Sequence, residues 1–259
     1  MATIEELFGV QGKVAVVTGG SRGIGYMIAE TLVDNGVRVY ITARKAEACD
    51  AAARALSGRG ECVSLPADMT VAEELQRFAS EIAEREDRLD ILVNNAGATW
   101  GAPIDEFPES GFDKVMDVNV KAPFFLTQAL LPQLRAAGTA EDPARIIMIG
   151  SIDGIAVSST DNFPYGASKA GVHMLARHLS SKLVGEDITV NAIAPGPFES
   201  KMMAFVLDDP ASRDAIERGV PRGRIGTPED IGGTVVFLSS RAGAYLTGTV
   251  IPVDGGLRT

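Results

Sequence analysis

The sequence predicts a doubly wound α/β fold, in which a seven-stranded parallel sheet carries helices on both faces. Seven short runs rich in β-branched and other apolar residues suit strands that are buried on both faces: residues 13–18, 37–42, 62–65, 91–93, 145–149, 188–193 and 249–253. Segments with helical period lie between them: residues 24–34, 72–86, 112–134, 166–184 and 228–239. Alternation of this kind implies parallel strands joined by right-handed helical crossovers.

The length of the chain and the absence of a linker predict a single domain over residues 1–259. A chain of 259 residues with 46% hydrophobic residues can bury one sizeable core. Two segments interrupt the alternation of strands and helices. We expect residues 136–143 to form a surface loop. Residues 197–226 follow the sixth strand and are long enough to form a lid over a binding site.

The charge balance argues against nucleic acids and anionic membranes as partners. The chain has 34 acidic and 24 basic residues, a net charge of -10, and no basic run. No apolar run reaches the length of about 18 residues that a membrane span needs, and the first residues lack the basic segment of a signal peptide. Cys49 and Cys62 have no metal-ligand spacing. We therefore expect reduced thiols in a cytoplasmic protein, with a disulfide as the alternative.

A glycine-rich turn follows the first predicted strand and precedes a helix. Glycines let the backbone approach a pyrophosphate closely, and the start of a helix offers free N–H groups and the positive end of the helix dipole. A lone glycine-rich turn is often only a tight turn, but its place in the first strand–turn–helix unit predicts a dinucleotide-binding Rossmann fold. The residues expected to bind the cofactor in this turn are Gly19, Ser21, Arg22, Gly23, Ile24 and Gly25.

The end of the second strand favours NADP(H) over NAD(H). Sites that prefer NAD place an acidic residue there to hold the ribose 2′-hydroxyl. This chain has Ala43, followed by Arg44 and Lys45, and Arg22 lies in the glycine turn itself. Arginines without an acidic neighbour suit a 2′-phosphate, which they bind through charge-assisted hydrogen bonds. The alternative is that both arginines are only solvated surface residues.

Tyr165 and Lys169 are four residues apart, so on a helix both side chains lie on one face. A phenol has an ordinary pKa of about 10, and a neighbouring ammonium group lowers it by favouring the phenolate. The pair is therefore a candidate proton donor and acceptor. The alternative is an ordinary amphipathic helix face, because such a pair alone is a weak signal.

Taken together, these motifs resemble those of the short-chain dehydrogenase/reductase family over essentially the whole chain. Order and spacing agree for Thr18-Gly19-x-x-x-Gly23-x-Gly25, Asp68, Asn94-Asn95-Ala96-Gly97, Asn119, Ser151, Tyr165-x-x-x-Lys169 and Pro195-Gly196. The resemblance implies that Tyr165 protonates the oxygen of a carbonyl that receives a hydride. It implies further roles for three residues. Lys169 lowers the pKa of Tyr165 and holds the nicotinamide ribose, Ser151 hydrogen-bonds the carbonyl, and Asn119 holds a water that passes protons to Lys169.

The resemblance also implies further contacts with the cofactor. Asp68, with Met69 beside it, is expected at the adenine amino group. Asn95, Ala96 and Gly97 are expected at the adenosine ribose, although they also suit a plain turn after a strand. After Pro195 and Gly196 the family usually has Thr four positions beyond the glycine, at the nicotinamide carboxamide. This chain has Ser200 there, which keeps the hydroxyl group.

Within the family, residues 94–151 look most like NADPH-dependent 3-oxoacyl reductases, including those associated with rhamnolipid production. The predicted lid contains Met202, Met203, Phe205, Val206 and Leu207, which suit a hydrophobic ketone or acyl thioester or simply pack the lid onto the body. Trp100 is expected either to stack on a substrate or to cap its loop.

The resemblance to reductases of fatty-acid synthesis is incomplete at the surface that receives an acyl carrier protein. By hand alignment, their basic residues on two long helices correspond to Phe125 and Ser181 here. A net charge of -10 would also repel an acidic carrier. We therefore expect a free, CoA-linked or otherwise small hydrophobic ketone as the substrate.

The resemblance implies a homotetramer, with one interface on helices 112–134 and 165–184 and the other on segments 228–239 and 249–253. Other functions stay open from the sequence. One is an NADP-dependent alcohol dehydrogenase acting on a sugar, polyol or steroid. A second is a non-catalytic dinucleotide sensor, against which the intact catalytic set argues. A third is a methyltransferase, which would not explain Tyr165 and Lys169.

Overall fold

The computed structural model describes residues 2–200, 203 and 209–258 and has the expected sheet. Within these residues the strands form a seven-stranded parallel sheet in the order β3-β2-β1-β4-β5-β6-β7. The bounds are Val14–Thr18 (β1), Arg38–Thr42 (β2), Cys62–Ser64 (β3), Ile91–Asn94 (β4), Ala144–Ile149 (β5), Ile188–Pro195 (β6) and Val250–Val253 (β7). Each predicted strand is confirmed to within one or two residues at its ends.

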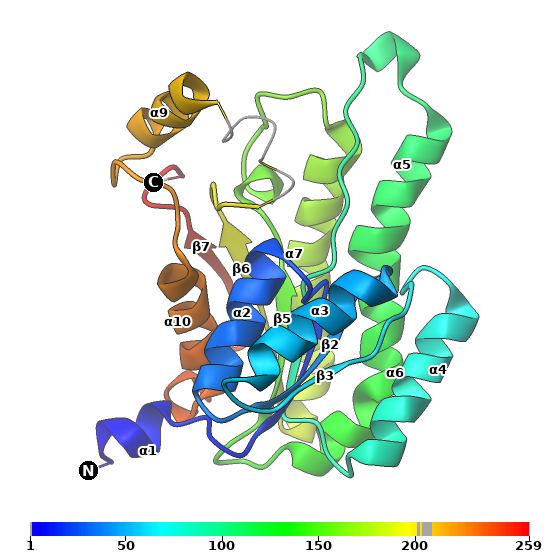
Figure 1. Cartoon of the computed structure of the whole chain (residues 1–259), viewed down its shortest axis with the longest axis vertical. Coiled ribbons are helices and arrows are strands. Elements are labelled where there is room, and N and C mark those ends of the chain that lie inside the picture. The colour runs from blue at the N-terminus through cyan, green and yellow to red at the C-terminus, as the bar shows by residue number, and fades with distance from the viewer. Residues whose placement is uncertain (1, 201–202, 204–208, 259) are drawn as a thin grey trace.

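Helices cover both faces of the sheet and enclose two apolar cores (Figure 1). One core lies under α2 (Gly23–Asp34), α3 (Ala46–Ser57) and α10 (Pro228–Ser239). The other lies under α4 (Ala72–Arg85), α6 (Ala122–Ala137) and α7 (Phe163–Leu183). The fully buried pattern of β1, β4, β5 and β6 follows from this double cover. The doubly wound fold is therefore confirmed.

Three helices were not expected from the sequence, and one expected helix is interrupted. The additional helices are α1 (Ile4–Phe8), α3 and α9 (Pro210–Gly219). Helix α9 shows that the segment after β6 is not a continuous loop. The single helix expected over residues 112–134 is instead α5 (Glu109–Met116), a π-helical turn η2 (Asp117–Lys121) and α6. Single π-turns of this kind occur frequently at functional sites.

The crossovers place a crevice at the carboxyl ends of β1 and β4. Strands β1, β2 and β3 follow one another toward one edge of the sheet. Strand β4 pairs with the other side of β1, and β5, β6 and β7 continue toward the opposite edge. In open parallel sheets this switch point is where ligands bind. The turns that follow β1, β4, β5 and β6 all lie at this end, and they carry most of the residues that the sequence predicts to be functional.

The opposite end of the sheet is held by a buried ionic cluster. Asp142 accepts hydrogen bonds from Lys13, at 2.7 Å, and from Arg145, at 3.0 Å. The Arg145 guanidinium also donates to the carbonyl oxygens of Leu238 and Ser240, both at 2.8 Å. Arg145 therefore caps the last turn of α10, where a cation is favourable.

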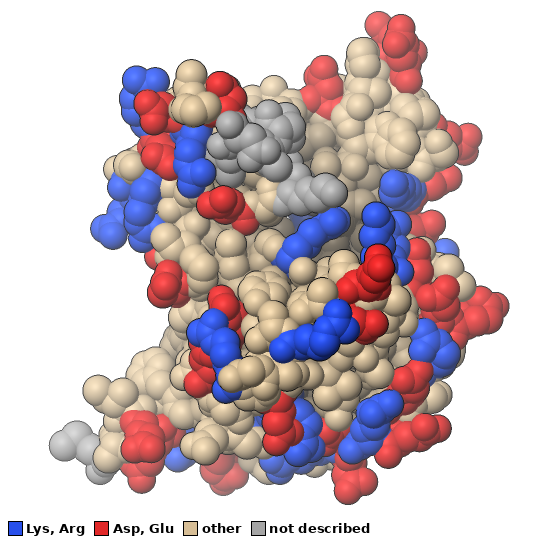
Figure 2. Space-filling model, viewed as in Figure 1, with Lys and Arg blue, Asp and Glu red and all other residues tan. Residues whose placement is uncertain are grey.

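Basic and acidic side chains are distributed unevenly over the surface. Figure 2 shows several Lys and Arg side chains beside a hollow near the centre of the face viewed, and Asp and Glu side chains both next to them and around the periphery. Among the helices of residues 2–200, 203 and 209–258, none combines the length and the apolar character that a bilayer span requires.

Candidate active site

The turns that follow β1 and β4 are joined into one unit by Thr18 and Asn95. The Thr18 hydroxyl accepts hydrogen bonds from the backbone N–H groups of Asn95 and Ala96, both at 2.9 Å. In return, the Asn95 amide donates to the carbonyl oxygen of Thr18 at 2.8 Å. The glycine turn is therefore braced by the very segment that the sequence placed at the adenosine ribose.

Glycine is required in this unit for space as well as for conformation. Gly19 has φ 66°, and a Cβ atom there would lie 2.9 Å from Nδ2 of Asn95. A Cβ on Gly25 would lie 2.3 Å from the same nitrogen. Gly23 has φ 53°, and a Cβ there would lie 3.1 Å from Cβ of Ser200. Two distant parts of the predicted cofactor site, Gly23 and Ser200, thus meet at the start of α2.

The two arginines predicted to bind a 2′-phosphate are exposed and available. Among the residues that the structure describes, neither Arg22 nor Arg44 takes part in an ion pair or a side-chain hydrogen bond. Most of the other arginines described are paired with carboxylates, as Arg38 is with Glu86. Free guanidinium groups beside a glycine turn fit an anionic group well.

The remaining residues predicted on the cofactor side lie around the same crevice. Asp68 follows β3, and its carboxylate accepts hydrogen bonds from the backbone N–H and the hydroxyl of Thr70, at 3.0 and 2.7 Å. Met69 is buried beside it. Gly196 follows β6 and packs on Asp254, because a Cβ there would lie 2.8 Å from Cα of Asp254. Pro195 is the last residue of β6.

Lys169 lies on α7 with its amine buried behind β5. The amine donates to the carbonyl oxygen of Ile149 at 2.8 Å. Among the described residues it has no carboxylate partner, and burial lowers its pKa to about 8. A Cβ on Gly97 would lie 3.6 Å from the Lys169 amine and 3.5 Å from Oδ1 of Asn119. The turn after β4, the π-turn and α7 therefore converge at one point.

Tyr165 lies one turn before Lys169, with the Lys169 amine 5.6 Å from the centre of its ring. In the protein alone the net shift in the pKa of this phenol is upward, and the lowering by Lys169 stays a prediction. Burial raises the pKa of Tyr165 to about 12, while a hydrogen bond from Ser151 opposes that rise and the charge of Asp153 adds to it. The physical reason is that desolvation penalises the phenolate more than its neighbours stabilise it.

Ser151 and Asn119 complete the predicted catalytic set. Ser151 follows β5, is buried, and begins the short turn η3 (Ile152–Gly154) by accepting a hydrogen bond from Asp153 N–H at 3.1 Å. Asn119 lies in the π-turn, where its amide accepts from Ala98 N–H at 2.8 Å. The same amide donates to the Ala98 carbonyl and to the Ser168 hydroxyl, both at 2.9 Å. The structure thus brings Ser151, Tyr165 and Lys169 together, with Asn119 bracing the adjoining loop.

The sequence assigned no role to three residues that hold this arrangement. Thr18, known only as the first residue of the glycine motif, links the turns after β1 and β4. Ser168 is fully buried and donates to the carbonyl oxygen of Tyr165 at 2.7 Å while accepting from Asn119. His173 lies one turn beyond Lys169, and its Nε2 is buried without a hydrogen-bond partner in the described part of the chain. The only available signal was the spacing of Ser168 and His173 from Tyr165 and Lys169.

Part of the predicted substrate side lies outside the described residues. This holds for Met202, Phe205, Val206 and Leu207 of the expected lid, whereas Met203 is described and half-buried. Trp100 packs its ring on Gly111, where a Cβ would lie 2.8 Å from the ring, and Lys114 lies 5.3 Å from the ring centre. The Trp100 ring is therefore held by α5, which supports the expectation that it caps its loop.

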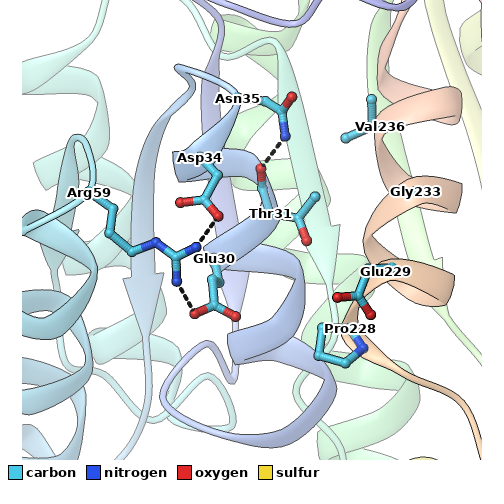
Figure 3. A pocket seen from close by; sticks show the side chains of 9 residues that line it. All are labelled: Glu30, Thr31, Asp34, Asn35, Arg59, Pro228, Glu229, Gly233 and Val236. Carbon is cyan, nitrogen blue, oxygen red and sulfur yellow. Dashed lines mark hydrogen bonds and ion pairs between the residues drawn. The ribbon is translucent and has the colours of Figure 1, made fainter.

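A separate groove of about 410 Å³ lies between α2 and α10, away from the catalytic residues (Figure 3). Arg59 points toward α2 and is held between Glu30 and Asp34. The Asn35 amide donates to the carbonyl oxygen of Thr31 at 2.8 Å. Because these polar groups satisfy one another, the groove shows no converging free groups of the kind that the crevice offers.

Comparison with known proteins identifies relatives along nearly the whole chain. The family model described as Enoyl-(Acyl carrier protein) reductase matches residues 19–258. The chain is 49% identical over 249 residues to the rhamnolipids biosynthesis 3-oxoacyl-[acyl-carrier-protein] reductase of Pseudomonas aeruginosa, covering 96% of this chain and 97% of that protein. It is 34% identical over 257 residues to the 5-keto-D-gluconate 5-reductase of Escherichia coli, covering 98% of each. The solved active-site complex of Pseudomonas aeruginosa RhlG with NADP superimposes with a TM-score of 0.95 and 48% identity over 98% of this chain and 99% of that one.

Proposed function

The chain belongs to the short-chain dehydrogenase/reductase family of oxidoreductases, and we propose that it reduces a 3-oxoacyl thioester or a similar hydrophobic ketone with NADPH. The single observation that carries this proposal is the convergence of Ser151, Tyr165 and Lys169 at the crevice where the glycine turn ends. A hydroxyl, a phenol and an ammonium group in a buried site are the groups that carbonyl reduction requires.

The crevice fits NADP(H) on its own geometry. Gly19 and Gly25 leave no room for side chains, so the backbone at the start of α2 stays accessible to a pyrophosphate. Arg22 and Arg44 are the cations assigned to the 2′-phosphate. The other residues assigned to the cofactor are Ser21, Gly23, Ile24, Asp68, Met69, Asn95, Ala96, Gly97, Tyr165, Lys169, Pro195, Gly196 and Ser200. The NADP bound by RhlG, which shares 48% of its residues with this chain, supports the same cofactor here.

The catalytic residues act on the oxygen of the carbonyl group. NADPH supplies the hydride that adds to the carbonyl carbon. Ser151 donates a hydrogen bond to the carbonyl oxygen as negative charge develops there. Tyr165 then transfers its phenolic proton to that oxygen, which completes the hydroxyl group. With a pKa of about 12, Tyr165 is fully protonated near neutral pH and is therefore ready to donate in the reductive direction.

Lys169 and Asn119 return the proton to Tyr165. Lys169, with a pKa of about 8, is mostly protonated at neutral pH and can pass a proton on. We assign Asn119 to the water that resupplies it. Both hydrogens of the Asn119 amide already bond to Ala98 and Ser168. A water at this residue would therefore have to donate to one of its oxygens.

Apolar side chains at the mouth of the site support a hydrophobic substrate. Ile155 and Val157 follow the turn that carries Ser151 and are exposed. Phe163 begins α7 and packs edge-on against Phe107, with ring centres 5.9 Å apart. Exposed apolar residues close to a polar catalytic centre are typical of a site for a ligand with a polar head and an apolar tail.

We assign the substrate to the free, CoA-linked or otherwise small ketones rather than to those bound to an acyl carrier protein. Phe125 is exposed and contributes no cation, and the Ser181 hydroxyl bonds back to the carbonyl oxygen of His178. The net charge of -10 adds long-range repulsion of an acidic carrier. The rhamnolipid reductase is named for a carrier-bound substrate, so the experiment below compares the CoA and carrier thioesters directly.

The test is the oxidation of NADPH, followed by its near-ultraviolet absorbance, with a panel of ketones. The panel contains acetoacetyl-CoA, a longer 3-oxoacyl-CoA, the matching acyl-carrier thioester, a diketone, a steroid and 5-keto-gluconate. Turnover of 3-oxoacyl thioesters supports the proposal, and comparable turnover of the CoA and carrier forms contradicts the assignment of the carrier. If no ketone is reduced while NADPH still binds, the proposed reductase activity is contradicted. A sensor that only binds the dinucleotide would then be favoured.

A second candidate substrate is a sugar acid or polyol. The 34% identity to the 5-keto-D-gluconate 5-reductase favours it, because the catalytic residues would serve both substrates. The same panel separates the two, since preferential turnover of 5-keto-gluconate would replace the lipid assignment while keeping the mechanism.

We further propose a homotetramer in the cytoplasm. Phe112, Phe124, Phe125 and Met174 are exposed on α5, α6 and α7, the helices expected at the first interface. The edge strand β7 and α10 form the second expected interface. Light scattering of the purified protein tests the tetramer. The free thiols of Cys49 and Cys62 support a reducing compartment.

A further inference from the structure

The imidazole ring of His173 lies inside the turn that carries Ser151. A Cβ on Gly150 would lie 2.0 Å from Nε2 of His173, and a Cβ on Gly154 would lie 2.8 Å from its Cε1. Ser151 lies between these two glycines and begins η3. The ring of His173 is thus enclosed by the residues that flank Ser151, and only 6% of the residue is exposed.

The same ridge of α7 carries the proton donor, the lysine and this histidine. Tyr165, Lys169 and His173 are spaced by four residues and therefore lie on one face of the helix. Gly154 also rests on the helix itself, because a Cβ there would lie 2.6 Å from the carbonyl carbon of Lys169. The contact between the turn and α7 therefore includes two glycines and the His173 ring, and Gly166 of α7 also lies against the carbonyl oxygen of Asp153.

This contact determines where the Ser151 hydroxyl lies relative to the Tyr165 phenol. The two groups belong to different elements, η3 and α7, yet both must reach one carbonyl oxygen. We infer that His173 is a positioning residue for the reaction, which holds the Ser151 turn against α7 so that the two hydroxyl groups meet the same oxygen. The inference rests on the proposed reductase function.

The chemical character of His173 suits this role. A flat ring fits in the narrow space beside Gly150 and Gly154, where a Cβ atom would overlap it. Burial lowers the pKa of His173 to about 4, and the nearby charge of Lys169 adds to this effect. The ring is therefore neutral at working pH and adds no second cation beside the Lys169 amine. Its unpaired Nε2 carries a free-energy cost that an apolar side chain would avoid.

The test is a double-mutant cycle on the full-length protein with His173→Ala, Gly150→Ala and the double variant. His173→Gln replaces the ring with another flat, neutral group, and His178→Ala is the matched control because His178 is exposed on the same helix. The readouts are kcat and KM with the preferred ketone, the Kd of NADPH, and hydrogen exchange of the backbone amides of Asp153, Gly154 and Ile155. These amides bond within the turn to Ser151 and Ile152.

His173→Ala is expected to lower kcat by about 10- to 100-fold, because a displacement of about 1 Å at the reacting groups costs that much. NADPH affinity should change little, since the glycine turn is untouched. Exchange of the three amides should accelerate about tenfold or more. His173→Gln should restore most of kcat, and His178→Ala should match the wild type.

Gly150→Ala is expected to cause a similar loss of kcat, because its methyl group would overlap the ring. In the double variant the methyl group enters the space that the ring has left. Its loss should therefore be smaller than the product of the two single losses. If Gly150→Ala does not fold, the comparison of His173→Ala with His173→Gln carries the test.

An unchanged kcat in His173→Ala overturns the inference, even if the protein is less stable, because His173 would then only fill space. The inference is also overturned if the loss of kcat in the double variant equals the product of the losses in His173→Ala and Gly150→Ala. If the wild type reduces no ketone, the proposed function has failed, and amide exchange then decides the inference alone. Unchanged exchange in His173→Ala would in that case show that His173 does not hold the turn.

Discussion

Two buried cations lie at opposite ends of strand β5 and differ in their partners. Arg145, at the beginning of the strand, is 1% exposed and bonds to the Asp142 carboxylate and to two carbonyl oxygens that end α10. Lys169 is 4% exposed and bonds to the carbonyl oxygen of Ile149 at the other end, without a carboxylate among the described residues. A buried cation with its counter-ion is typical of structure, whereas one without a counter-ion indicates function.

Burial lowers the pKa of both cations, but the consequences differ. The Asp142 carboxylate opposes the effect at Arg145, and a guanidinium group stays charged near neutral pH in any case. The pKa of Lys169 falls to about 8, within reach of working pH. One end of the sheet therefore has a fixed charge that stabilises the fold. The other has a charge that can change during the reaction.

The largest effect is expected from the partner of Lys169 at the reactive end. Tyr165→Phe removes the only hydroxyl group assigned to protonate the substrate, so kcat should fall by about 10²- to 10⁴-fold or more. The Kd of NADPH should change little, because Tyr165 is only one of the residues assigned to the cofactor and the glycine turn and the arginines remain. Tyr245→Phe is the control, since Tyr245 is fully exposed. Retained turnover in Tyr165→Phe would refute its assigned role.

The two cations can be compared directly by the same substitution. Arg145→Met leaves Asp142 and the end of α10 without their donor, so the free energy of unfolding should fall by about 3–5 kcal/mol. Turnover per folded molecule should stay the same. Lys169→Met removes a buried charge that has no counter-ion among the described residues, so stability should be kept while kcat falls by about 10²-fold or more. Denaturant titration and steady-state kinetics measure the two effects.

Equal losses of stability in the two variants would contradict the distinction between them. So would a loss of turnover in Arg145→Met that persists at temperatures where the variant is fully folded. Lys13→Met is a further control, because it removes a single ion pair from the same cluster as Arg145 and keeps the Arg145–Asp142 bond.

The features that sequence predicted well are those set by local pattern. Apolar runs placed the strands, and the four-residue spacing placed Tyr165 and Lys169 on one helix face. Helix α3 was missed although Cys49, Ala52, Ala53 and Leu56 follow a helical period and are buried. The reason is that alanine and cysteine give a weak apolar signal.

The features that sequence missed depend on contacts between distant segments. The π-turn at Asn119 is tied to Ala98 and Ser168, which lie 21 and 49 residues away in the chain. The rise in the pKa of Tyr165 depends on how far the groups packed around the phenol remove it from water, although the residue itself stays partly exposed. Spacing along the sequence predicts which side chains lie close together. Only the packed structure determines whether desolvation or neighbouring charges have the larger effect on their pKa values.

A smaller effect is expected at the exposed cations of the reactive end. Arg44→Ala should raise the Kd of NADPH by about 10- to 100-fold, or 1–3 kcal/mol, because a charged hydrogen bond to the 2′-phosphate is lost. The Kd of NADH, which lacks this phosphate, should change much less. Arg59→Ala is the matched control, since Arg59 is paired in the groove between α2 and α10. An equal rise in the Kd values of NADPH and NADH would show that Arg44 does not bind the 2′-phosphate.

The smallest effect is expected from pH, through a residue beside Lys169. His173 has a pKa of about 4 in the folded protein and an ordinary value of about 6.5 when unfolded. The unfolded chain therefore binds more protons between these values, so stability is complete above about pH 6.5 and falls as the pH approaches 4. Lys169 and Arg177 both oppose a charge on the ring, and only the carbonyl oxygen of Gly154 favours it.

His173→Leu removes this titration while keeping a side chain of similar size. Between pH 7 and 5 the wild type should lose about 1–2 kcal/mol of unfolding free energy more than the variant does. Denaturant titrations at the two pH values measure the difference. His178→Leu is the matched control, because His178 is exposed on the same helix. Parallel losses in the wild type and His173→Leu would mean that water reaches the ring. Solvent would then reach the reactive end more freely than the burial of His173 and Lys169 implies.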